Sequence, residues 1–157
     1  MPDNQKEYLT QEKFDGLGKE LEQLKTVRRK EVAEELEYAK GLGDLSENAE
    51  YQEARNNQAT IEERIAKLED ILKRAVIINE KDHTTDVVNI GSTVTVKKDA
   101  GPSVVYKIVG SEESDMSQNH VSIRSPFGSA ALGKKKGDQF TYATPAGKMT
   151  YKVVDIK

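Results

Sequence analysis

The chain has 157 residues, of which 36% are hydrophobic, 32% charged and 6% aromatic, and it contains neither Cys nor Trp. Ordinary globular chains are about 45–50% apolar and about 25% charged, so this composition disfavours one compact core and favours an extended, solvated part. The missing cysteines exclude disulfides, thiol nucleophiles and thiolate metal sites. No stretch approaches the roughly 20 apolar residues of a membrane span, and the N-terminus has no apolar signal segment, so we expect a soluble cytoplasmic protein without a membrane partner.

The net charge of −3 is unevenly distributed along the chain. Residues 1–78 carry 13 basic and 18 acidic side chains, whereas residues 79–157 carry 11 and 9. A uniformly basic nucleic-acid binder is therefore disfavoured. The contrast predicts two modules with different partners.

Residues from about 10 to 75 have the pattern of two helices. Thr10 suits an N-cap, and the run that follows is rich in Glu, Lys and Leu. Gly16 and Gly18 cost about 1 kcal/mol each relative to Ala, so we expect the first turns to fray. Apolar residues of the first helix are spaced by three and four, with a polar interruption at 28–31: Phe14, Leu17, Leu21, Leu24, Val32, Leu36 and Ala39. The second helix keeps this spacing: Ala54, Gln58, Ile61, Ile65, Leu68, Leu72 and Ala75. Both stripes are typical of a coiled-coil seam.

The segment Gly41-Leu42-Gly43-Asp44 lies between the two helical patterns and is a break that ends one helix and begins another. Two helices of similar length on either side of it predict an antiparallel hairpin. Pairing Leu24 with Ile65, and continuing the same register along both stripes, places the turn at Asp44. Roughly thirty residues at ~1.5 Å each make an arm on the order of 45 Å long, with Asp44 at its far end.

After residue 78 the pattern changes to that of strands. Short runs rich in Val, Ile, Thr and Tyr alternate with turn signals that contain Gly or Pro. We expect strands near residues 87–90, 93–96, 104–109, 120–123, 139–142 and 149–156. Ser125 followed by Pro126 predicts one short helix that runs to Leu132. The sequence thus predicts an α+β protein: an antiparallel coiled-coil hairpin over 1–78 with its tip near 41–51, a linker over 79–86, and a small antiparallel sheet domain with one short helix over 87–157.

The predicted turn is acidic. Asp44, Glu47, Glu50 and Glu53 recur at every third position, and no Lys or Arg lies between positions 40 and 55. Asp-x-x-Glu before a helix is also a capping box, so a purely structural role stays open. Two carboxylates at an exposed end suit Mg²⁺, which takes oxygen ligands and keeps several waters. Because two are too few to hold the ion, we expect a second molecule to complete its coordination.

The run Asp44-Leu45-Ser46-Glu47-Asn48-Ala49-Glu50-Tyr51, followed by Ala54-Arg55, resembles the tip of the bacterial Gre transcript cleavage factors. The resemblance extends over nearly the whole chain and includes the Arg28-Arg29 pair, Gly91-Ser92-Thr93-Val94-Thr95-Val96 and Ser125-Pro126. Two features depart from the family pattern. Lys30 stands where the family usually has Pro, and Gly16 and Gly18 weaken the first helix.

The resemblance implies a factor that enters the secondary channel of RNA polymerase, with the tip at the polymerase active site and an FKBP-like C-terminal domain at the channel rim. Asp44 and Glu47 would hold a weakly bound Mg²⁺ jointly with the polymerase and help to place the attacking water of a two-metal hydrolysis. The polymerase-docking loop would be Ser125, Pro126 and Phe127. Residues implied in supporting the tip or contacting the 3′ end of backtracked RNA are Leu45, Ser46, Asn48, Glu50, Tyr51 and Arg55, with Arg28 and Arg29 as a basic pair on the arm. Neither an enzyme in isolation nor a small-molecule substrate is implied.

Several alternatives stay open. A solvated charge paired across the hairpin would also explain each Arg, and an ordinary helix start with a core Phe would explain Ser125 to Phe127. A regulator that occupies the channel without promoting cleavage would share the fold and differ at the tip. A third class is an enzyme in its own right, a prolyl isomerase or a metal hydrolase, although the C-terminal half offers few aromatic residues for a proline pocket and fold alone does not determine function.

Overall fold

The computed structural model describes residues 5–43, 48–79 and 85–157. The predicted tip residues Asp44, Leu45, Ser46 and Glu47, and most of the predicted linker, lie outside the described residues. The chain divides into two compact units, Phe14–Arg74 on the one hand and Met1–Lys13 with Ala75–Lys157 on the other. None of the helices in the described ranges is both long enough and apolar enough to cross a membrane.

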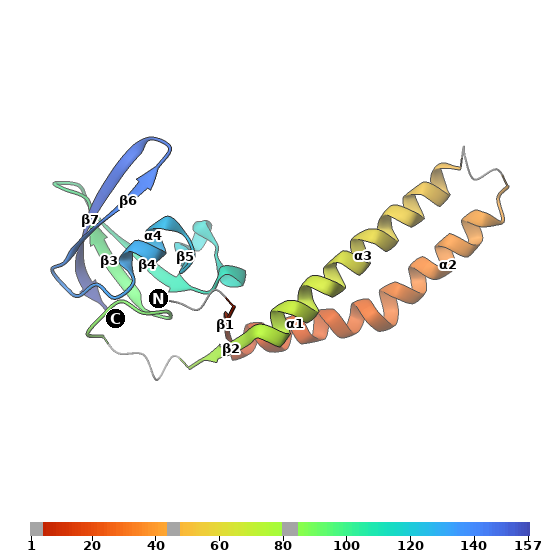
Figure 1. Cartoon of the computed structure of the whole chain (residues 1–157), viewed down its shortest axis with the longest axis horizontal. Coiled ribbons are helices and arrows are strands. Elements are labelled where there is room, and N and C mark those ends of the chain that lie inside the picture. The colour runs from red at the N-terminus through yellow and green to blue at the C-terminus, as the bar shows by residue number, and fades with distance from the viewer. Residues whose placement is uncertain (1–4, 44–47, 80–84) are drawn as a thin grey trace. The chain divides into compact units, whose positions relative to one another are not determined.

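The unit Phe14–Arg74 is the predicted helical hairpin, with its two arms side by side in Figure 1. The first arm consists of α1 (Gln11–Gln23), the π-helix η1 (Leu24–Arg28) and α2 (Arg29–Lys40), and the second arm is α3 (Ala49–Arg74). One seam joins them, with a buried cluster of Val32, Ile61 and Ile65 against which Leu24 packs. Leu24 thus packs against the cluster that contains Ile65, its partner in the predicted register.

The seam of the second arm differs from the predicted stripe at two positions. Gln58 is exposed and Leu72 is only half-buried, whereas Asn57 is half-buried and Ile71 is 2% exposed. An α-helix has 3.6 residues per turn, so a strict seven-residue repeat drifts around its surface and the neighbouring position takes over.

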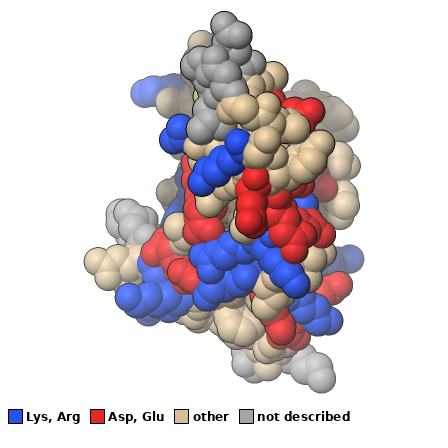
Figure 2. All heavy atoms as spheres, turned by 90° about the vertical axis from the view of Figure 1, so that its right-hand side faces the viewer, with Lys and Arg blue, Asp and Glu red and all other residues tan. Residues whose placement is uncertain are grey.

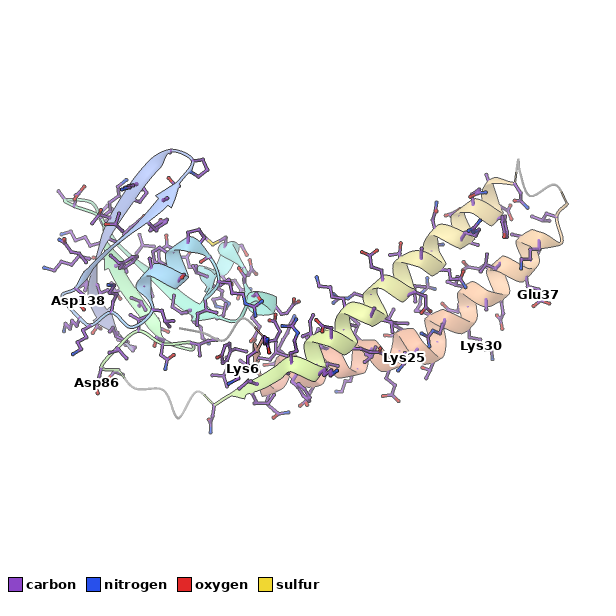
Figure 3. The ribbon with its side chains drawn as sticks, in the orientation of Figure 1. Lys6, Lys25, Lys30, Glu37, Asp86 and Asp138 are labelled. Carbon is purple, nitrogen blue, oxygen red and sulfur yellow. The ribbon has the colours of Figure 1, made fainter. Side chains whose placement is uncertain are left out.

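Ion pairs cross the hairpin on both sides of the seam. The Nζ atom of Lys25 lies 2.8 Å from Glu69, Nε of Arg29 lies 2.7 Å from Glu62, and Nε of Arg64 lies 2.8 Å from Glu20. Lys25, Lys30 and Glu37 stand along the first arm in Figure 3. Solvent screens exposed pairs of this kind, so they favour the observed register more than they add stability.

The polar interruption in the first arm coincides with one residue more than the heptad spacing allows. Val32 follows Leu24 by eight positions, one more than a heptad allows. In η1 the backbone N–H of Arg29 donates to the carbonyl of Leu24, which closes a π-type turn. The hydroxyl of Thr26 also donates to the carbonyl of Glu22 at 2.7 Å, which competes with the regular helical ladder. A π-turn absorbs one inserted residue, and it thereby keeps Val32 and the residues after it on the seam.

The C-terminal part of the chain forms one five-stranded sheet with the order β5-β4-β3-β7-β6. Its strands are β3 (Thr93–Lys97), β4 (Ser103–Val109), β5 (His120–Ser122), β6 (Gln139–Thr144) and β7 (Gly147–Ile156). The sheet is mixed rather than wholly antiparallel, because β4 and β5 are parallel while the other pairs are antiparallel. Two 3-10 turns, η3 (Ser111–Glu113) and η4 (Met116–Gln118), lie in the crossover that a parallel pair needs.

One face of this sheet and the short helix α4 (Pro126–Ala131) enclose the core. The buried residues there are Val88, Val94, Val96, Ile108, Val121, Ile123, Phe127, Ala131, Phe140, Val153 and Ile156. The strand expected at 87–90 does not form. Val88 is buried in a loop instead, where its N–H donates to Lys134 and its carbonyl accepts from Gly133.

Two further strands flank the hairpin in sequence. β1 (Glu7–Thr10) precedes α1, β2 (Ala75–Ile78) follows α3, and the two pair in parallel from Glu7 opposite Ala75 to Thr10 opposite Ile78. Both strands belong to the same compact unit as the C-terminal sheet. The hairpin is therefore shorter at both ends than the predicted range 1–78.

Deleting Thr26 is expected to be tolerated far better than deleting Ala33. Loss of one residue from η1 leaves a regular α-helix whose flanking turns keep their faces. Loss of Ala33 rotates Leu36 and Ala39 off the seam, at a cost on the order of 2–4 kcal/mol. By thermal unfolding we expect Tm to fall by about 5–10 °C for the Ala33 deletion and by about 2 °C or less for the Thr26 deletion. Equal losses would contradict the role assigned to the π-turn.

Candidate functional site

Asn48 joins the two arms at the far end of the hairpin. It directly precedes α3, and its Oδ1 atom accepts the backbone N–H of Tyr51 at 3.1 Å, which is an N-cap bond. Its Nδ2 atom donates to the carbonyl of Ala39, near the end of α2, at 2.6 Å. One side chain thus ties together the two points between which the chain carries Asp44 and Glu47. Asn48 is therefore the capping residue of α3, which begins at Ala49. Asp44 and Glu47, for which the sequence also allowed a capping box, lie outside the described residues.

The side of the hairpin next to Asn48 is acidic. A hollow of about 390 Å³ is lined there by Glu35, Tyr38, Glu50, Glu53, Ala54 and Asn57. The ring of Tyr38 is 66% exposed. Clustered carboxylates give this hollow a negative potential that disfavours phosphate groups. Within residues 5–43, 48–79 and 85–157, no three His, Cys, Asp or Glu side chains are grouped so that they could hold a metal ion.

Tyr51 and Arg55 lie one turn apart at the start of α3. The Arg55 guanidinium stands over the Tyr51 ring, 5.9 Å from its centroid, in a cation–π arrangement. Arg55 is exposed, and no ion pair is formed by it with any residue that the structure describes. Its positive charge is thus available close to the acidic turn.

The predicted basic pair on the arm is occupied by carboxylates. Arg28 pairs with Glu31 on its own arm, and Arg29 makes two hydrogen bonds to Glu62 across the hairpin, at 2.7 and 2.9 Å. The hydrogen bonds from Arg29 hold the pKa of the Glu62 carboxyl below its usual value. Figure 2 shows the same mixture on the hairpin end of the molecule, where basic and acidic patches lie next to one another. For Arg29 this is the geometry of a charge paired across the coiled coil.

Ser125, Pro126 and Phe127 begin α4, as the sequence predicts. The Ser125 hydroxyl accepts the N–H of Gly128 at 3.0 Å and donates to the carbonyl of Ser122 at 2.6 Å, while Pro126 occupies the first turn. A Cβ at Gly128 would lie 2.1 Å from the Ser122 carbonyl oxygen. Only glycine lets α4 approach the end of β5 this closely, which fixes where Pro126 and Phe127 stand.

These residues form one wall of an apolar groove in the C-terminal unit. The groove has a volume of about 260 Å³ and is lined by Tyr106, Met116, Val121, Ser125, Pro126, Phe127, Tyr142, Ala143, Thr144 and Pro145. Met116 is 63% exposed at its edge, an unusual position for a large apolar side chain. Most of the residues that line the groove are apolar or aromatic.

The expectation of few aromatic residues for a pocket in this half is wrong. Phe127 packs edge-on against Phe140, Tyr142 and Tyr151, with ring centroids 5.3 to 5.7 Å apart, and lies 4.9 Å from Tyr106. Burial raises the pKa of Tyr142 to about 12, so its hydroxyl stays neutral in the physiological range. The sequence signal that could have indicated this cluster is the alternation of side chains on β6. It puts Phe140 and Tyr142 on one face of the sheet, where Phe140 lies opposite Tyr151 of β7.

The predicted site residues that the structure describes thus fall into three groups. Arg28 and Arg29 lie along the arm and pair with Glu31 and Glu62. Asn48, Glu50, Tyr51 and Arg55 lie together around the start of α3, whereas Ser125 to Phe127 line the apolar groove of the other unit. Asp44, Leu45, Ser46 and Glu47 lie outside the described residues.

Replacing Asn48 with Ala is expected to loosen the end of the hairpin, because both the N-cap bond and the bond to Ala39 are lost. An N-cap substitution costs about 1 kcal/mol and the second hydrogen bond about as much again. Hydrogen exchange should therefore speed up about tenfold or more in residues 36–40 and 49–54 and stay unchanged in the C-terminal sheet. Asn48→Ser is the matched control, since its hydroxyl keeps the cap and it loses only the bond to Ala39. Equal exchange in Asn48→Ala and the unmodified protein would contradict this role.

Two family models match the chain in succession. The N-terminal domain of transcription elongation factors GreA and GreB matches residues 7–77, and the C-terminal GreA/GreB domain matches residues 83–157. A transcription elongation factor GreA of Thermoanaerobacter pseudethanolicus is 50% identical over 150 residues, which are 95% of this chain and 96% of that protein. Another from Acetivibrio thermocellus is 48% identical over 158 residues, covering 100% of this chain and 99% of that one. Among solved structures, GreA factor homolog 1 of Thermus thermophilus is 30% identical, with a TM-score of 0.44 and coverage of 97% and 99%. With both domain models matched in order and relatives near half identical over their full length, the chain belongs to the GreA/GreB family of transcription elongation factors.

Proposed function

We propose that this chain enters the secondary channel of a bacterial RNA polymerase and stimulates the polymerase to cleave the 3′ end of backtracked RNA. The observation that carries this function is the carboxylate pair Asp44 and Glu47, which the sequence places in the turn of a hairpin whose two arms Asn48 ties together. Family membership supports a factor that works through the polymerase rather than an enzyme by itself. Such a factor acts in the bacterial cytoplasm.

The donor chemistry of the turn fits magnesium. Asp44 and Glu47 offer hard carboxylate oxygens, and no sulfur or imidazole lies among residues 41–51. Two carboxylates leave most of an octahedral coordination shell for the polymerase and for water. When bound between the two proteins, magnesium lowers the pKa of a coordinated water and stabilises negative charge on oxygen. This chain contributes the two carboxylates and holds them at the end of a stiff arm.

Arg55 is the residue that we assign to the RNA phosphates. It is exposed, it lies one turn from Tyr51, and the acidic hollow lined by Glu50 and Glu53 would repel a phosphate. Arg28 and Arg29 would have to leave Glu31 and Glu62 before they could bind RNA, so their contribution would be smaller. The small positive surface around Arg55 fits a factor that contacts few RNA phosphates.

We assign the apolar groove beside α4 to docking on the polymerase. Its lining of Pro126, Phe127, Met116 and Tyr142 presents apolar surface with few polar groups, as protein-binding grooves do. A partner segment with apolar side chains at the channel rim would fill it. The same groove would serve a regulator that binds the channel without cleavage, and the intact pair Asp44 and Glu47 is what favours the cleavage factor.

Cleavage assays on a stalled, backtracked polymerase with labelled RNA test the tip. With Mg²⁺ present, the unmodified chain is expected to release short 3′ fragments at least about 100 times faster than the polymerase alone, because charge stabilisation at the reacting oxygen is worth several kcal/mol. Asp44→Asn combined with Glu47→Gln should abolish the acceleration. The matched control Glu34→Gln with Glu37→Gln removes the same charge from the exposed arm and should leave it intact. Equal activity of the two double variants would refute the proposed role of the tip, and RNA cleavage without polymerase would show an autonomous nuclease.

Substituting Met116 tests the groove. Met116→Glu puts a charge at the groove edge without touching the core, so it should raise the factor concentration for half-maximal cleavage about tenfold and leave the saturated rate unchanged. Val105→Glu is the control, because Val105 is 48% exposed and does not line the groove. If both variants shift the half-maximal concentration equally, the groove is not the docking site.

A further inference from the structure

The beginning of α1 is weaker than its neighbours by sequence. Gly16 and Gly18 lie within its first two turns, and each lowers the helix–coil equilibrium about fivefold relative to Ala. A Cβ at either position would meet no atom within 4 Å, so packing does not require glycine there. The helix nevertheless begins at Gln11, and Leu17 between the two glycines is 4% exposed. Something outside the helix must hold its start.

Thr10 is the residue at that start, and Glu113 of η3 holds it. The backbone N–H of Thr10 donates to Oε2 of Glu113 at 3.1 Å, and its hydroxyl donates to Oε1 at 2.8 Å. The same hydroxyl oxygen accepts the N–H of Lys13 at 3.2 Å, which is the N-cap bond of α1. The carboxylate therefore fixes both the backbone and the side chain of the capping residue.

The residues just before Thr10 are held by an ion pair whose carboxylate is buried. Glu7 is only 4% exposed, and its carboxylate accepts Nη1 of Arg124 at 2.9 Å and the Ser111 hydroxyl at 3.0 Å. Nη2 of Arg124 donates to the carbonyl of Lys6 at 2.8 Å; Figure 3 shows Lys6 beside β1. A buried carboxylate is stable only when it is paired and hydrogen-bonded, as Glu7 is.

The backbone of β1 also lies so close to Gly110 that no side chain fits between them. A Cβ at Gly110 would lie 1.8 Å from the carbonyl oxygen of Tyr8. On its other side, β1 pairs along its whole length with β2, the strand that follows α3. The segment from Lys6 to Thr10 thus has a defined seat made of Gly110, Ser111, Glu113 and Arg124.

We propose that Glu7, Thr10, Glu113 and Arg124, which we call the latch, are positioning residues for transcript cleavage. The latch keeps α1 helical from its first turn despite Gly16 and Gly18, and the saturated rate of stimulated cleavage depends on it. The second half of this proposal rests on the proposed function. The physical reason is that fraying of α1 takes Leu17 off the seam and loosens one arm, while a displacement of about 1 Å at a reacting group costs on the order of 100-fold in rate.

The test compares Thr10→Val, which removes the capping hydroxyl, with Thr10→Ser, which keeps it. Hydrogen exchange should quicken about fivefold in residues 11–20 for Thr10→Val and remain unchanged for Thr10→Ser. The saturated cleavage rate should fall at least about threefold for Thr10→Val, while the factor concentration for half-maximal cleavage stays constant because the groove is untouched. Glu113→Ala should reproduce both effects, and Glu112→Ala, its neighbour in η3, should reproduce neither.

A second-site rescue separates positioning from general destabilisation. Adding Gly16→Ala and Gly18→Ala to Thr10→Val restores helix propensity without restoring the latch. The exchange rate in residues 11–20 and the saturated cleavage rate should then both return to within about twofold of the values of the unmodified protein. If the alanines restore the exchange but not the cleavage, or if Thr10→Val quickens exchange without slowing cleavage, the positioning role is overturned. If exchange in residues 11–20 does not respond to Thr10→Val or Glu113→Ala, the latch itself is overturned. If the unmodified chain gives no stimulated cleavage, the proposed function and the positioning role fail together, and exchange alone then supports or overturns the latch's hold on α1.

Discussion

A hairpin of two helices has a single seam in which to bury apolar side chains, and the rest of the arm follows from that constraint. Each helix contributes one narrow stripe, so most of its surface is polar and the chain as a whole is poor in apolar residues. A misplaced residue cannot be absorbed by a second layer. The extra residue after Leu24 is instead taken up by the π-turn η1, and pairs such as Arg29 with Glu62 flank the seam on its solvent side.

Because the seam is narrow, the buried apolar side chains nearest the far end of the described hairpin are as small as Ala39 and Ala54. Asn48 does the structural work there with one amide group, which caps α3 and binds the end of α2. The neighbouring positions are then available for carboxylates that a thicker structure would have to pair or exclude. The C-terminal unit differs from the hairpin, because its core includes an aromatic ring. That ring, of Phe127, also forms part of the lining of the apolar groove.

The sequence was sufficient wherever a signal was local and periodic. Heptad spacing predicted both arms and the contact of Leu24 with the cluster around Ile65, and Ser125 with Pro126 predicted the start of α4. Thr10 was recognised as an N-cap, but Glu7–Thr10 was not recognised as a strand, because β2, with which it pairs, lies more than sixty residues away. The aromatic cluster around Phe127 was not predicted either, because its rings come from α4 and from strands whose neighbours the sequence pattern did not assign. In the sequence, the π-turn was indicated only by the interruption of the apolar stripe of the first helix.

The two ends of the hairpin differ in what holds them, and this difference suits the proposed function. At the far end, one side chain joins the arms and the carboxylates are too few to retain an ion, so reactive chemistry depends on the partner. At the near end, three features hold β1: the pair of the buried Glu7 carboxylate with Arg124, the two hydrogen bonds from Thr10 to Glu113, and the close approach of Gly110 to Tyr8. The contacts that hold the chain are thus concentrated where it enters α1. Under the proposed function, Asp44 and Glu47 would promote cleavage only once the polymerase supplies the remaining magnesium ligands. Such a factor can circulate without cleaving RNA and act only when it is docked.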